Sequence, residues 1–281
     1  MKFLAQYIPY FDFQILQQNK MQLFLLIVCT AILLVETTRF TKYILQKHTQ
    51  TFQAIPRSTN RFFSCILLYF ILHTLLFYPI IRLYPQIKDN IFLQMIVFEI
   101  FQIMYCLLLF YIIQGHPEFK LIHSGIQKTN FTTIFNATIS YLTYLPWYFV
   151  IIAITYLLFA YFQIPIFEQE IAEHIKTSTD WNLFFAILMV LVFAPWIEEY
   201  IYRVFLYSEL RNYLSPTKAI FLTAIIFTLV HQNIFATLPI FTLALFLTIT
   251  YEKTQNYFII VTIHTMHNLL TLLYTYASNT L

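Results

Sequence analysis

The sequence predicts an all-α fold, a polytopic transmembrane helix bundle with about eight spans. Its mean hydropathy is +0.68, and 59% of the 281 residues are hydrophobic while 10% are charged. A soluble globular domain has too little interior to bury so much apolar surface, which excludes that class of fold. Several apolar stretches also approach the roughly 20 residues that a helix needs to cross the hydrocarbon core.

Eight apolar stretches are candidates for membrane-spanning helices, the first of them short. They cover residues 21–35, 62–81, 91–113, 139–162, 182–196, 219–233, 235–251 and 257–274. The loop at 37–61 contains five basic residues and no acidic one, so the positive-inside rule places it in the cytoplasm. Alternation along the chain puts Arg211 and Lys218 on the same side and the acidic residues of 168–180 on the opposite side.

Charge and cysteine usage narrow the range of partners. The net charge of +3 is small and comes from loops beside the spans, so we expect contact with membrane lipid and none with nucleic acid. Three cysteines lie within apolar stretches, which supports neither a disulfide framework nor a cysteine zinc cluster. Size and composition favour the inner membrane of a bacterium.

Two adjacent carboxylates and an arginine follow the apolar stretch at 182–196. Each such charge costs roughly 2.5 to 3.5 kcal/mol at the centre of a membrane helix, so these groups are usually paired and functional. Glu199 and Arg203 are spaced i, i+4 on one helix face, whereas Glu198 is turned by about 100°. We therefore expect Glu199 to pair with Arg203 and Glu198 to be available as a general base. An ordinary salt bridge at a cytoplasmic helix end is the alternative.

Two later apolar stretches also contain polar patterns with helical spacing. His231 follows Phe227 by four residues, and His264 and Asn268 share a face one turn apart, with His267 offset by about 60° from His264. Each pattern alone is typical of a packing residue. Their occurrence on successive stretches favours a shared polar site.

Glu99 and His73 are further polar residues within predicted spans, and they support a different function. They could pair with each other or with partners on other helices, as internal polar contacts between helices usually do. A chain of Glu and His side chains is also what a proton-coupled transporter contains. A polytopic transporter is therefore the alternative function.

The motifs Glu198-Glu199-x-x-x-Arg203, Phe227-x-x-x-His231 and His264-x-x-x-Asn268 resemble, in this order, the CPBP family of intramembrane proteases, also called the Abi or type II CAAX prenyl endopeptidase family. The resemblance covers about residues 182–274. It implies a catalytic helix core at 181–276, preceded by N-terminal membrane helices and loops at 1–180. Tyr202 stands where the family usually has phenylalanine, and Val204 where glycine is common.

The resemblance implies a role for each residue. Glu198 with His231 would activate a water molecule, Glu199 and Arg203 would support the site, and His264 with Asn268 would stabilise the oxyanion of the tetrahedral intermediate. The expected substrate is a peptide or protein at the membrane, of a prenylated or bacteriocin type. A family member that has become a non-cleaving immunity or scaffold protein is a further alternative.

Other proteolytic chemistries fit the sequence less well. Glu198, His231 and His264 could coordinate zinc, but the H-E-x-x-H pattern is absent, so we favour hydrolysis driven by glutamate without a committed metal. The two glycines, Gly115 and Gly125, cannot supply the Gly-x-Ser motif of rhomboid-like proteases or the Gly-x-Gly-Asp motif of presenilin-like proteases.

The depth of the site in the membrane corrects the predicted helix ends. Along helix axes at 1.5 Å per residue, Glu198 lies about 25 Å from the outer end at Trp181, and His231 about 20 Å from the inner end at Lys218. In a core of about 30 Å the two would miss each other by some 15 Å. We therefore expect the glutamate helix to continue through Leu210 or beyond and the next helix to begin before Ala219. The site is expected to open toward the cytoplasmic half of the bilayer.

Overall fold

The computed structural model describes residues 78–88, 90–114, 125–126, 130–166, 175–176 and 180–277, with short pieces at 30–31, 34–35, 38–39, 52–55, 64–65, 68–69 and 71–72. Every regular element in this part of the chain is a helix, as predicted. The first are α5 (Tyr78–Leu83), α6 (Pro85–Lys88), α7 (Ile91–Gln114) and α8 (Phe131–Phe162). The later ones are α10 (Asp180–Leu188), η3 (Met189–Phe193), α11 (Ala194–Glu199), η4 (Tyr200–Tyr207), α12 (Ser208–Arg211), α13 (Pro216–Val230), α14 (Thr237–Thr254) and α15 (Tyr257–Ala277).

Four of the described helices are long and apolar enough to cross a membrane, which makes the chain an integral membrane protein. They span Phe92–Ile113, Phe131–Phe162, Trp181–Arg211 and Tyr257–Tyr276, and Pro216–Val230 is a shorter apolar helix. The stretches predicted at 21–35 and 62–81 fall largely outside the described residues, so the count of eight spans stays a prediction. The span predicted to start at residue 139 begins earlier, at Phe131.

The helix that carries the paired glutamates is longer than its hydropathy indicates. Elements α10, η3, α11, η4 and α12 follow one another without a break, so a single helix of 31 residues runs from Trp181 to Arg211. The next helix, α13, begins at Pro216. The predicted continuation of the glutamate helix through Leu210 and the predicted start of the next helix before Ala219 are therefore both confirmed. At 1.5 Å per residue, Glu198 lies about 20 Å along its helix from Arg211, and His231 lies about 22 Å along its helix from Pro216. The two residues therefore reach similar depths from the same end of the bundle.

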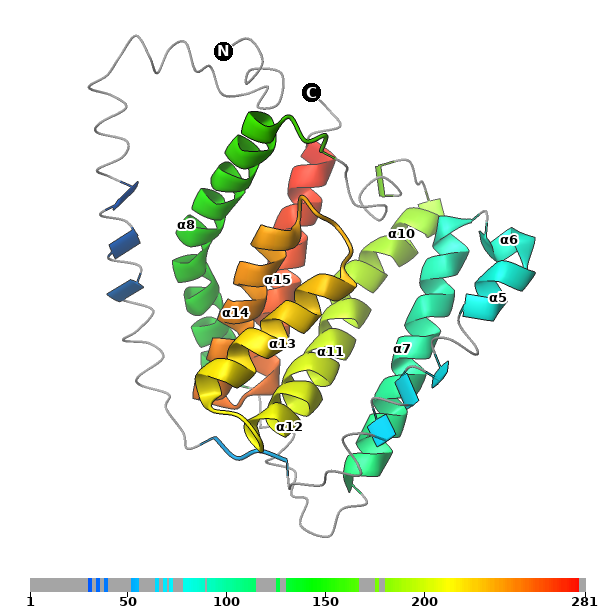
Figure 1. Cartoon of the computed structure of the whole chain (residues 1–281), viewed down its shortest axis with the longest axis horizontal. Helices are drawn as coiled ribbons and strands as arrows, with labels where there is room; N and C mark the ends of the chain where they lie inside the picture. Colours follow the sequence, from blue (N-terminus) through cyan, green and yellow to red (C-terminus); the bar gives the residue numbers. More distant parts are fainter. Residues whose placement is uncertain are drawn as a thin grey trace.

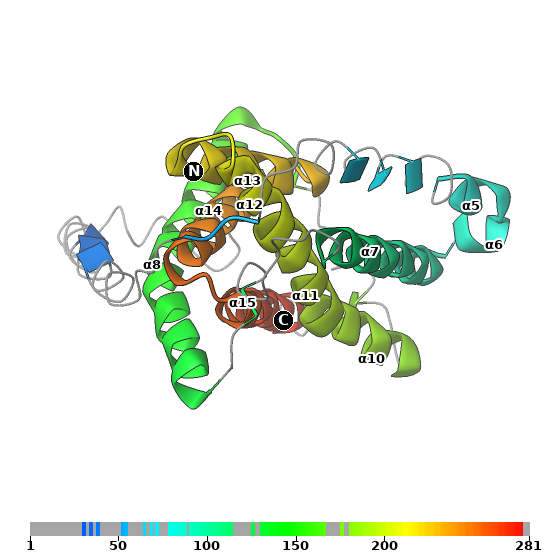
Figure 2. The ribbon, with the colours of Figure 1, turned by 90° about the horizontal axis from the view of Figure 1, so that it is seen from below.

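The helices pack around this long helix, which we call the glutamate helix (Trp181–Arg211). In Figure 1 it descends from α10 to α12, and α13 and α14 form an antiparallel pair beside it. Helix α15 packs between the glutamate helix and α8, while α7 lies on the opposite flank against α11 and η4 (Figure 2). The glutamate helix is thus contacted by α7 from one side and by α13 and α15 from the other.

Polar side chains and left-handed residues set the ends of several helices. Asn130 caps α8 by accepting from the Thr133 amide, and Asn256 accepts from the amides of Phe258 and Ile259 at the start of α15. Gln255 ends α14 with φ of 43°, a left-handed conformation that stops a helix. The Gln255–Asn256 pair therefore reverses the chain within two residues.

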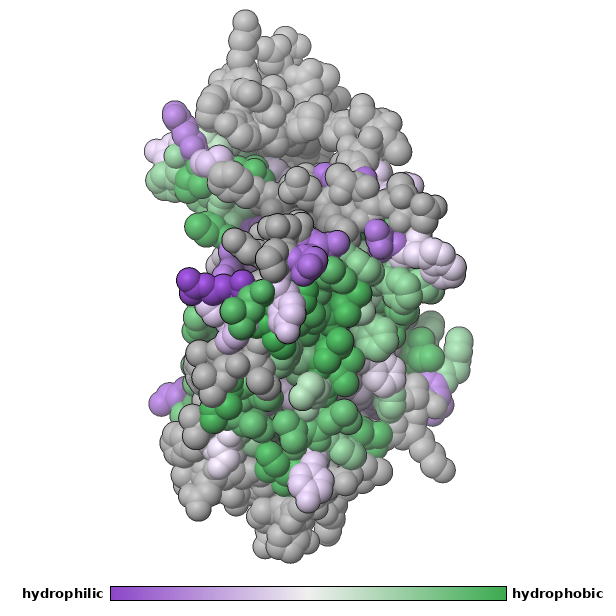
Figure 3. Space-filling model, turned by 90° about the vertical axis from the view of Figure 1, so that its right-hand side faces the viewer, coloured by the Kyte–Doolittle hydropathy of each residue, from purple (hydrophilic) through white to green (hydrophobic). Residues whose placement is uncertain are grey.

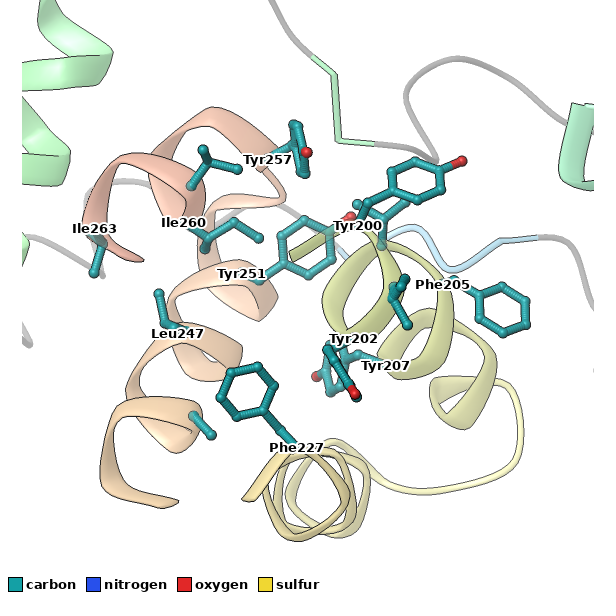
Figure 4. Close-up of a cluster of buried hydrophobic side chains, with 14 of the residues drawn as sticks. Tyr200, Tyr202, Phe205, Tyr207, Phe227, Leu247, Tyr251, Tyr257, Ile260 and Ile263 are labelled. Carbon is teal, nitrogen blue, oxygen red and sulfur yellow. The ribbon is translucent and has the colours of Figure 1, made fainter. Parts of the chain in front are cut away.

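An aromatic core fills the space between the glutamate helix and α13, α14 and α15. Figure 4 shows Tyr202, Phe227 and Tyr251 pointing into this space, whereas Phe205 points away from it on the far side of the glutamate helix. Tyr207 and Tyr251 are fully buried, and Phe227 is 1% exposed. The other labelled members are Tyr200, Tyr202, Phe205, Leu247, Tyr257, Ile260 and Ile263. Because these side chains are packed on all sides, they fix the glutamate helix relative to α15.

Several loops meet at one end of the bundle, the lower end in Figure 1. Gln53 and Gln255 exchange two hydrogen bonds, and the Asn212 amide donates to the carbonyl of Ile55. The Tyr257 amide donates to the carbonyl of Gly125, where φ is +67° and an added Cβ would lie 3.0 Å from Tyr251. The contacting residues, which belong to loops that alternation assigns to the cytoplasm, therefore share one end of the molecule.

Apolar side chains cover the middle of the surface, as a lipid-facing protein requires. The face shown in Figure 3 has a green apolar band across its middle, and polar residues gather above it. Large side chains on α7 and α8 are highly exposed, including Leu107, Tyr111, Trp147 and Phe149. Such exposure would be unusual in a soluble monomer and is the normal condition in lipid.

Candidate active site

Glu199 lies at the centre of a buried ionic cluster. Its Oε1 accepts a hydrogen bond of 2.8 Å from Nη1 of Arg203, and neither side chain is exposed to solvent. The guanidinium of Arg203 also lies over the ring of Phe227, with Cζ 4.4 Å from the centroid. The predicted pairing of Glu199 with Arg203 is thus present, deep in the protein rather than at a surface.

His264 joins this cluster from α15 and reaches both glutamates. Its Nδ1 lies 2.7 Å from Oε1 of Glu199, and its Nε2 lies 3.9 Å from Oε2 of Glu198. A carboxylate only accepts hydrogen bonds, so Nδ1 of His264 carries the proton of the shorter contact. Nε2 of His264 therefore donates only when the ring is doubly protonated, a charge that the two glutamates are placed to balance.

His231 is held at the C-terminal end of α13 by its own helix. Its Nδ1 lies 2.7 Å from the carbonyl oxygen of Phe227, one turn earlier, and its ring lies 4.7 Å from the Phe227 ring. A carbonyl oxygen only accepts, so Nδ1 carries a proton and Nε2 of the neutral ring keeps its lone pair. The Phe227 spacing therefore fixes the tautomer of His231, which leaves Nε2 to accept a proton.

Phe227 connects the parts of the site. Besides His231 and Arg203, its ring contacts His264 at 6.1 Å and Tyr202 at 4.9 Å between centroids. Sequence reasoning used Phe227 only to mark the spacing to His231. The residues that its ring contacts are far apart in the sequence. The one indication of its role there is that the motif ending at His231 begins with this phenylalanine.

Asn268 and Thr265 of α15 bind carbonyls of the glutamate helix. The Asn268 amide donates to Val190 over 2.8 Å, and the Thr265 hydroxyl donates to Leu191 over 3.1 Å. Pro195 has no backbone N–H. An N–H at this position would donate to the carbonyl of Val190 in a π-helix, or to that of Leu191 in an α-helix. The two side chains therefore satisfy carbonyls near the point where proline interrupts the ladder, and they attach α15 to the segment just before the glutamates.

A cavity of about 310 Å³ brings the candidate residues together. Glu198, His231, His264 and Asn268 all line it, while Glu199 and Arg203 lie behind its wall. The remaining lining residues come mainly from α7, η3 and α15: Met95, Phe98, Glu99, Gln102, Ile175, Met189, Val190, Ala194, Ile197, Thr271, Leu272 and Thr275. Of the glutamate pair, Glu198 is therefore the one open to a substrate, with a side chain 22% exposed.

The cavity extends toward the end of the bundle where α7 begins and α15 ends, opposite to Arg211 and Lys218. Beyond His231 it is lined by α7, η3, α15 and Ile175, because α13 ends at Val230. The cytoplasmic side of the bundle is assigned by the charge pattern alone, so the expected opening toward the cytoplasmic half stays a prediction.

The comparison with known families locates this site within a recognised segment. Residues 180–270 match the family model described as type II CAAX prenyl endopeptidase, Rce1-like. These residues form an Rce1-like domain. The resemblance predicted from the motifs is confirmed for this segment, which contains all six predicted site residues. No curated protein and no solved structure matches the chain.

Two other polar residues of the predicted spans lie in different settings. His267, in the Rce1-like domain, faces α8 instead of the cavity, with Nδ1 3.4 Å from the Tyr141 hydroxyl and its ring 4.5 Å from that of Tyr148. Glu99, which precedes the Rce1-like domain, lines the same cavity as Glu198. Its suggested partner His73 lies outside the described residues.

The cavity of the Rce1-like domain does not present a ready metal site. Among the described residues, no three His, Cys, Asp or Glu side chains are arranged to hold a metal ion. Glu198, His231 and His264, the three residues that could coordinate zinc by their chemistry, therefore do not fit zinc in this arrangement.

Proposed function

We propose that this protein is an intramembrane endopeptidase that hydrolyses a peptide bond of a membrane-associated substrate with a water molecule activated by Glu198. The observation that carries the proposal is the cavity, since Glu198, His231, His264 and Asn268 reach it from three separate helical segments. The match of residues 180–270 to an Rce1-like endopeptidase model supports the same reaction class.

Glu198 and His231 are the proposed proton acceptors for the attacking water. Glu198 is the carboxylate of the pair that is not committed to Arg203, and it lines the cavity. The hydrogen bond from Nδ1 of His231 to Phe227 leaves Nε2 with a lone pair that can hold the water. A positioned general base typically accelerates such a step about 10²- to 10⁴-fold.

His264 and Asn268 are the proposed donors to the oxyanion. His264 donates from Nε2 in its doubly protonated form, while Nδ1–H remains on Glu199. One N–H of Asn268 is used by Val190, and the second is the one available to the substrate. Each donor aimed at a developing oxyanion is worth about 3 to 4 kcal/mol in comparable sites.

Glu199 and Arg203 are proposed to support the site without touching the substrate. Glu199 orients the ring of His264, and Arg203 holds Glu199 in place through a buried hydrogen bond. This arrangement is the carboxylate–histidine pairing that holds an imidazole in one orientation.

The substrate is proposed to be a peptide presented from the lipid. The cavity walls beyond the polar groups are apolar, formed by side chains such as Met95, Phe98, Met189 and Leu272. A peptide segment with aliphatic side chains or a lipid tail could move from the lipid into this apolar cavity at little cost in free energy. Prenylated peptides and bacteriocin-type peptides are the two classes to test first, with the bacterial inner membrane as the proposed location.

The deciding experiment is hydrolysis of a quenched peptide panel, with and without a lipid tail, by the purified protein in detergent. We expect Glu198→Ala and His231→Ala each to lower kcat/KM by at least about 100-fold. Glu252→Gln is the matched control, because this carboxylate binds Tyr207 and Arg211 at the end of the bundle, outside the cavity. Cleavage that survives both cavity substitutions would sink the proposal.

Two further measurements separate the alternatives. Loss of wild-type activity on chelation, with recovery on added zinc, would replace the metal-free mechanism. A transporter would instead show flux in proteoliposomes that depends on Glu99 and survives Glu198→Ala. A non-cleaving immunity or scaffold protein would cleave no member of the panel.

A further inference from the structure

Glu99 is a second carboxylate in the cavity, beside Glu198, and it comes from outside the Rce1-like segment. It lies on α7, the helix that flanks α11 and η4 in Figure 2, and it is 7% exposed. The cavity that it lines also contains Glu198, His231, His264 and Asn268. Helix α7 therefore adds an acidic group to a site whose proposed catalytic residues all belong to residues 180–270.

The guanidinium and the imidazole nearest to the paired glutamates are already engaged without Glu99. Glu199 is paired with Arg203, and Glu198 lies 3.9 Å from Nε2 of His264, whose second nitrogen is bound to Glu199. Two carboxylates thus face one guanidinium and one imidazole ring. Among the described residues that line the cavity there is no further Lys or Arg to offset a third negative charge. A buried carboxyl without a cationic partner is more stable with its proton, and a protonated carboxyl is a hydrogen-bond donor.

Gln102 indicates that the same face of α7 is shaped for a polar ligand. It follows Glu99 by three residues, is 8% exposed and lines the cavity. Its Oε1 is buried and has no hydrogen-bond partner among the described residues. A buried acceptor without a hydrogen bond is unfavourable, so a bound group with an N–H, such as an extended peptide, would stabilise it.

We propose that Glu99 is the general acid that protonates the leaving amine. This proposal rests on the hydrolysis proposed above and adds a residue to it from α7. Glu198 and Glu99 then divide the proton transfers, with Glu198 ionised at the start as the base and Glu99 protonated as the acid. Neighbouring carboxyl groups whose environments differ in this way are a recurring means of acid–base catalysis.

The proton transfers balance over one cycle. The water oxygen bonds to the scissile carbonyl carbon, and one water proton passes to Glu198, assisted by His231. The C–N bond then breaks while Glu99 transfers its proton to the departing nitrogen, which leaves as an amine. The proton held by Glu198 passes to Glu99 through water after the products leave. One water is consumed, one carboxyl and one amine product form, and both glutamates return to their starting states.

The test compares two leaving groups on the same acyl peptide. A peptide from the panel is prepared as an anilide, whose nitrogen needs a proton to leave, and as a p-nitrophenyl ester, whose phenolate leaves without one. We expect Glu99→Gln to lower kcat for the anilide about 100-fold and kcat for the ester by no more than about threefold. Glutamine keeps the size and a donor N–H at this position but cannot transfer a proton.

Matched variants make the outcome decisive. Ile100→Ala changes the neighbouring residue on α7, which is 51% exposed toward lipid, and should leave both rates unchanged. Gln102→Leu, which removes the proposed peptide contact, should raise KM for both substrates alike. Equal losses on anilide and ester in Glu99→Gln would show a merely structural role and overturn the proposal, as would no loss on either. Failure of the hydrolysis proposal is recognised separately, because the wild-type protein would then cleave neither substrate, or Glu198→Ala would retain activity on both.

Discussion

The two sides of the glutamate helix differ in how completely their charges are enclosed. On one side Glu199 is fully buried and bonded to both Arg203 and His264. On the other, the adjacent Glu198 opens into the cavity, with its Oε2 3.9 Å from Nε2 of His264. Two consecutive residues of identical chemistry thus occupy unlike environments because a helix turns them by about 100°. The enclosed carboxylate can only organise its neighbours, whereas the open one can meet a substrate.

The comparison predicts that substitutions on the enclosed side act on folding and substitutions on the open side act on the reaction. The largest effect is expected for Arg203→Met. It leaves the Glu199 carboxylate buried with only His264 as a partner, and breaking a buried ion pair typically costs about 3 to 5 kcal/mol. Thermal unfolding of the purified protein in detergent should show a large loss of stability or no folded protein.

A double variant serves as the control for that prediction. Glu199→Gln together with Arg203→Met removes both charges, so it should recover a large part of the lost stability. An Arg203→Met protein as stable as the wild type would show that the cluster is accessible to water. The contrast between the two sides of the helix would then be lost.

A smaller effect is expected where α15 attaches to the glutamate helix. Thr265→Val removes the donor to the Leu191 carbonyl and should lower stability by about 1 kcal/mol. In a Pro195→Ala background, Thr265→Val should lower stability by less. Alanine at position 195 has a backbone N–H that can donate to the carbonyl one turn earlier. A double-mutant cycle by thermal unfolding measures this coupling. Equal costs in both backgrounds would mean that the hydroxyl does not replace the donor that proline lacks.

The parts of the site that were predictable from the sequence are those set by helical periodicity. The pairing of Glu199 with Arg203 and the separate setting of Glu198 follow from spacing within one helix, which is a local property. The continuation of the glutamate helix came from matching the depth of His231, because hydropathy ends at the charges.

Other parts depend on contacts that no spacing reveals. Three features depend on residues that are distant in sequence. They are the π-helical segments η3 and η4, the hydrogen bonds from Asn268 and Thr265 to carbonyls near Pro195, and the ring contacts of Phe227. The same holds for Glu99. Its position within a span was evident, but its place beside Glu198 depends on how α7 packs against α11.

The smallest effect on stability is expected for Glu198→Gln, and it tests the comparison most directly. The side chain is partly exposed to the cavity and makes no contact as short as those of Glu199, so its neutral analogue should change the unfolding free energy by only about 0.5 kcal/mol or less. The same variant should lose about 100-fold or more in kcat, because an amide cannot take a proton from water. Unfolding and hydrolysis measured on one preparation give both numbers. A stability loss as large as that of Arg203→Met would place Glu198 in the same structural role as its neighbour, whereas a stable and inactive protein would separate the two carboxylates by function.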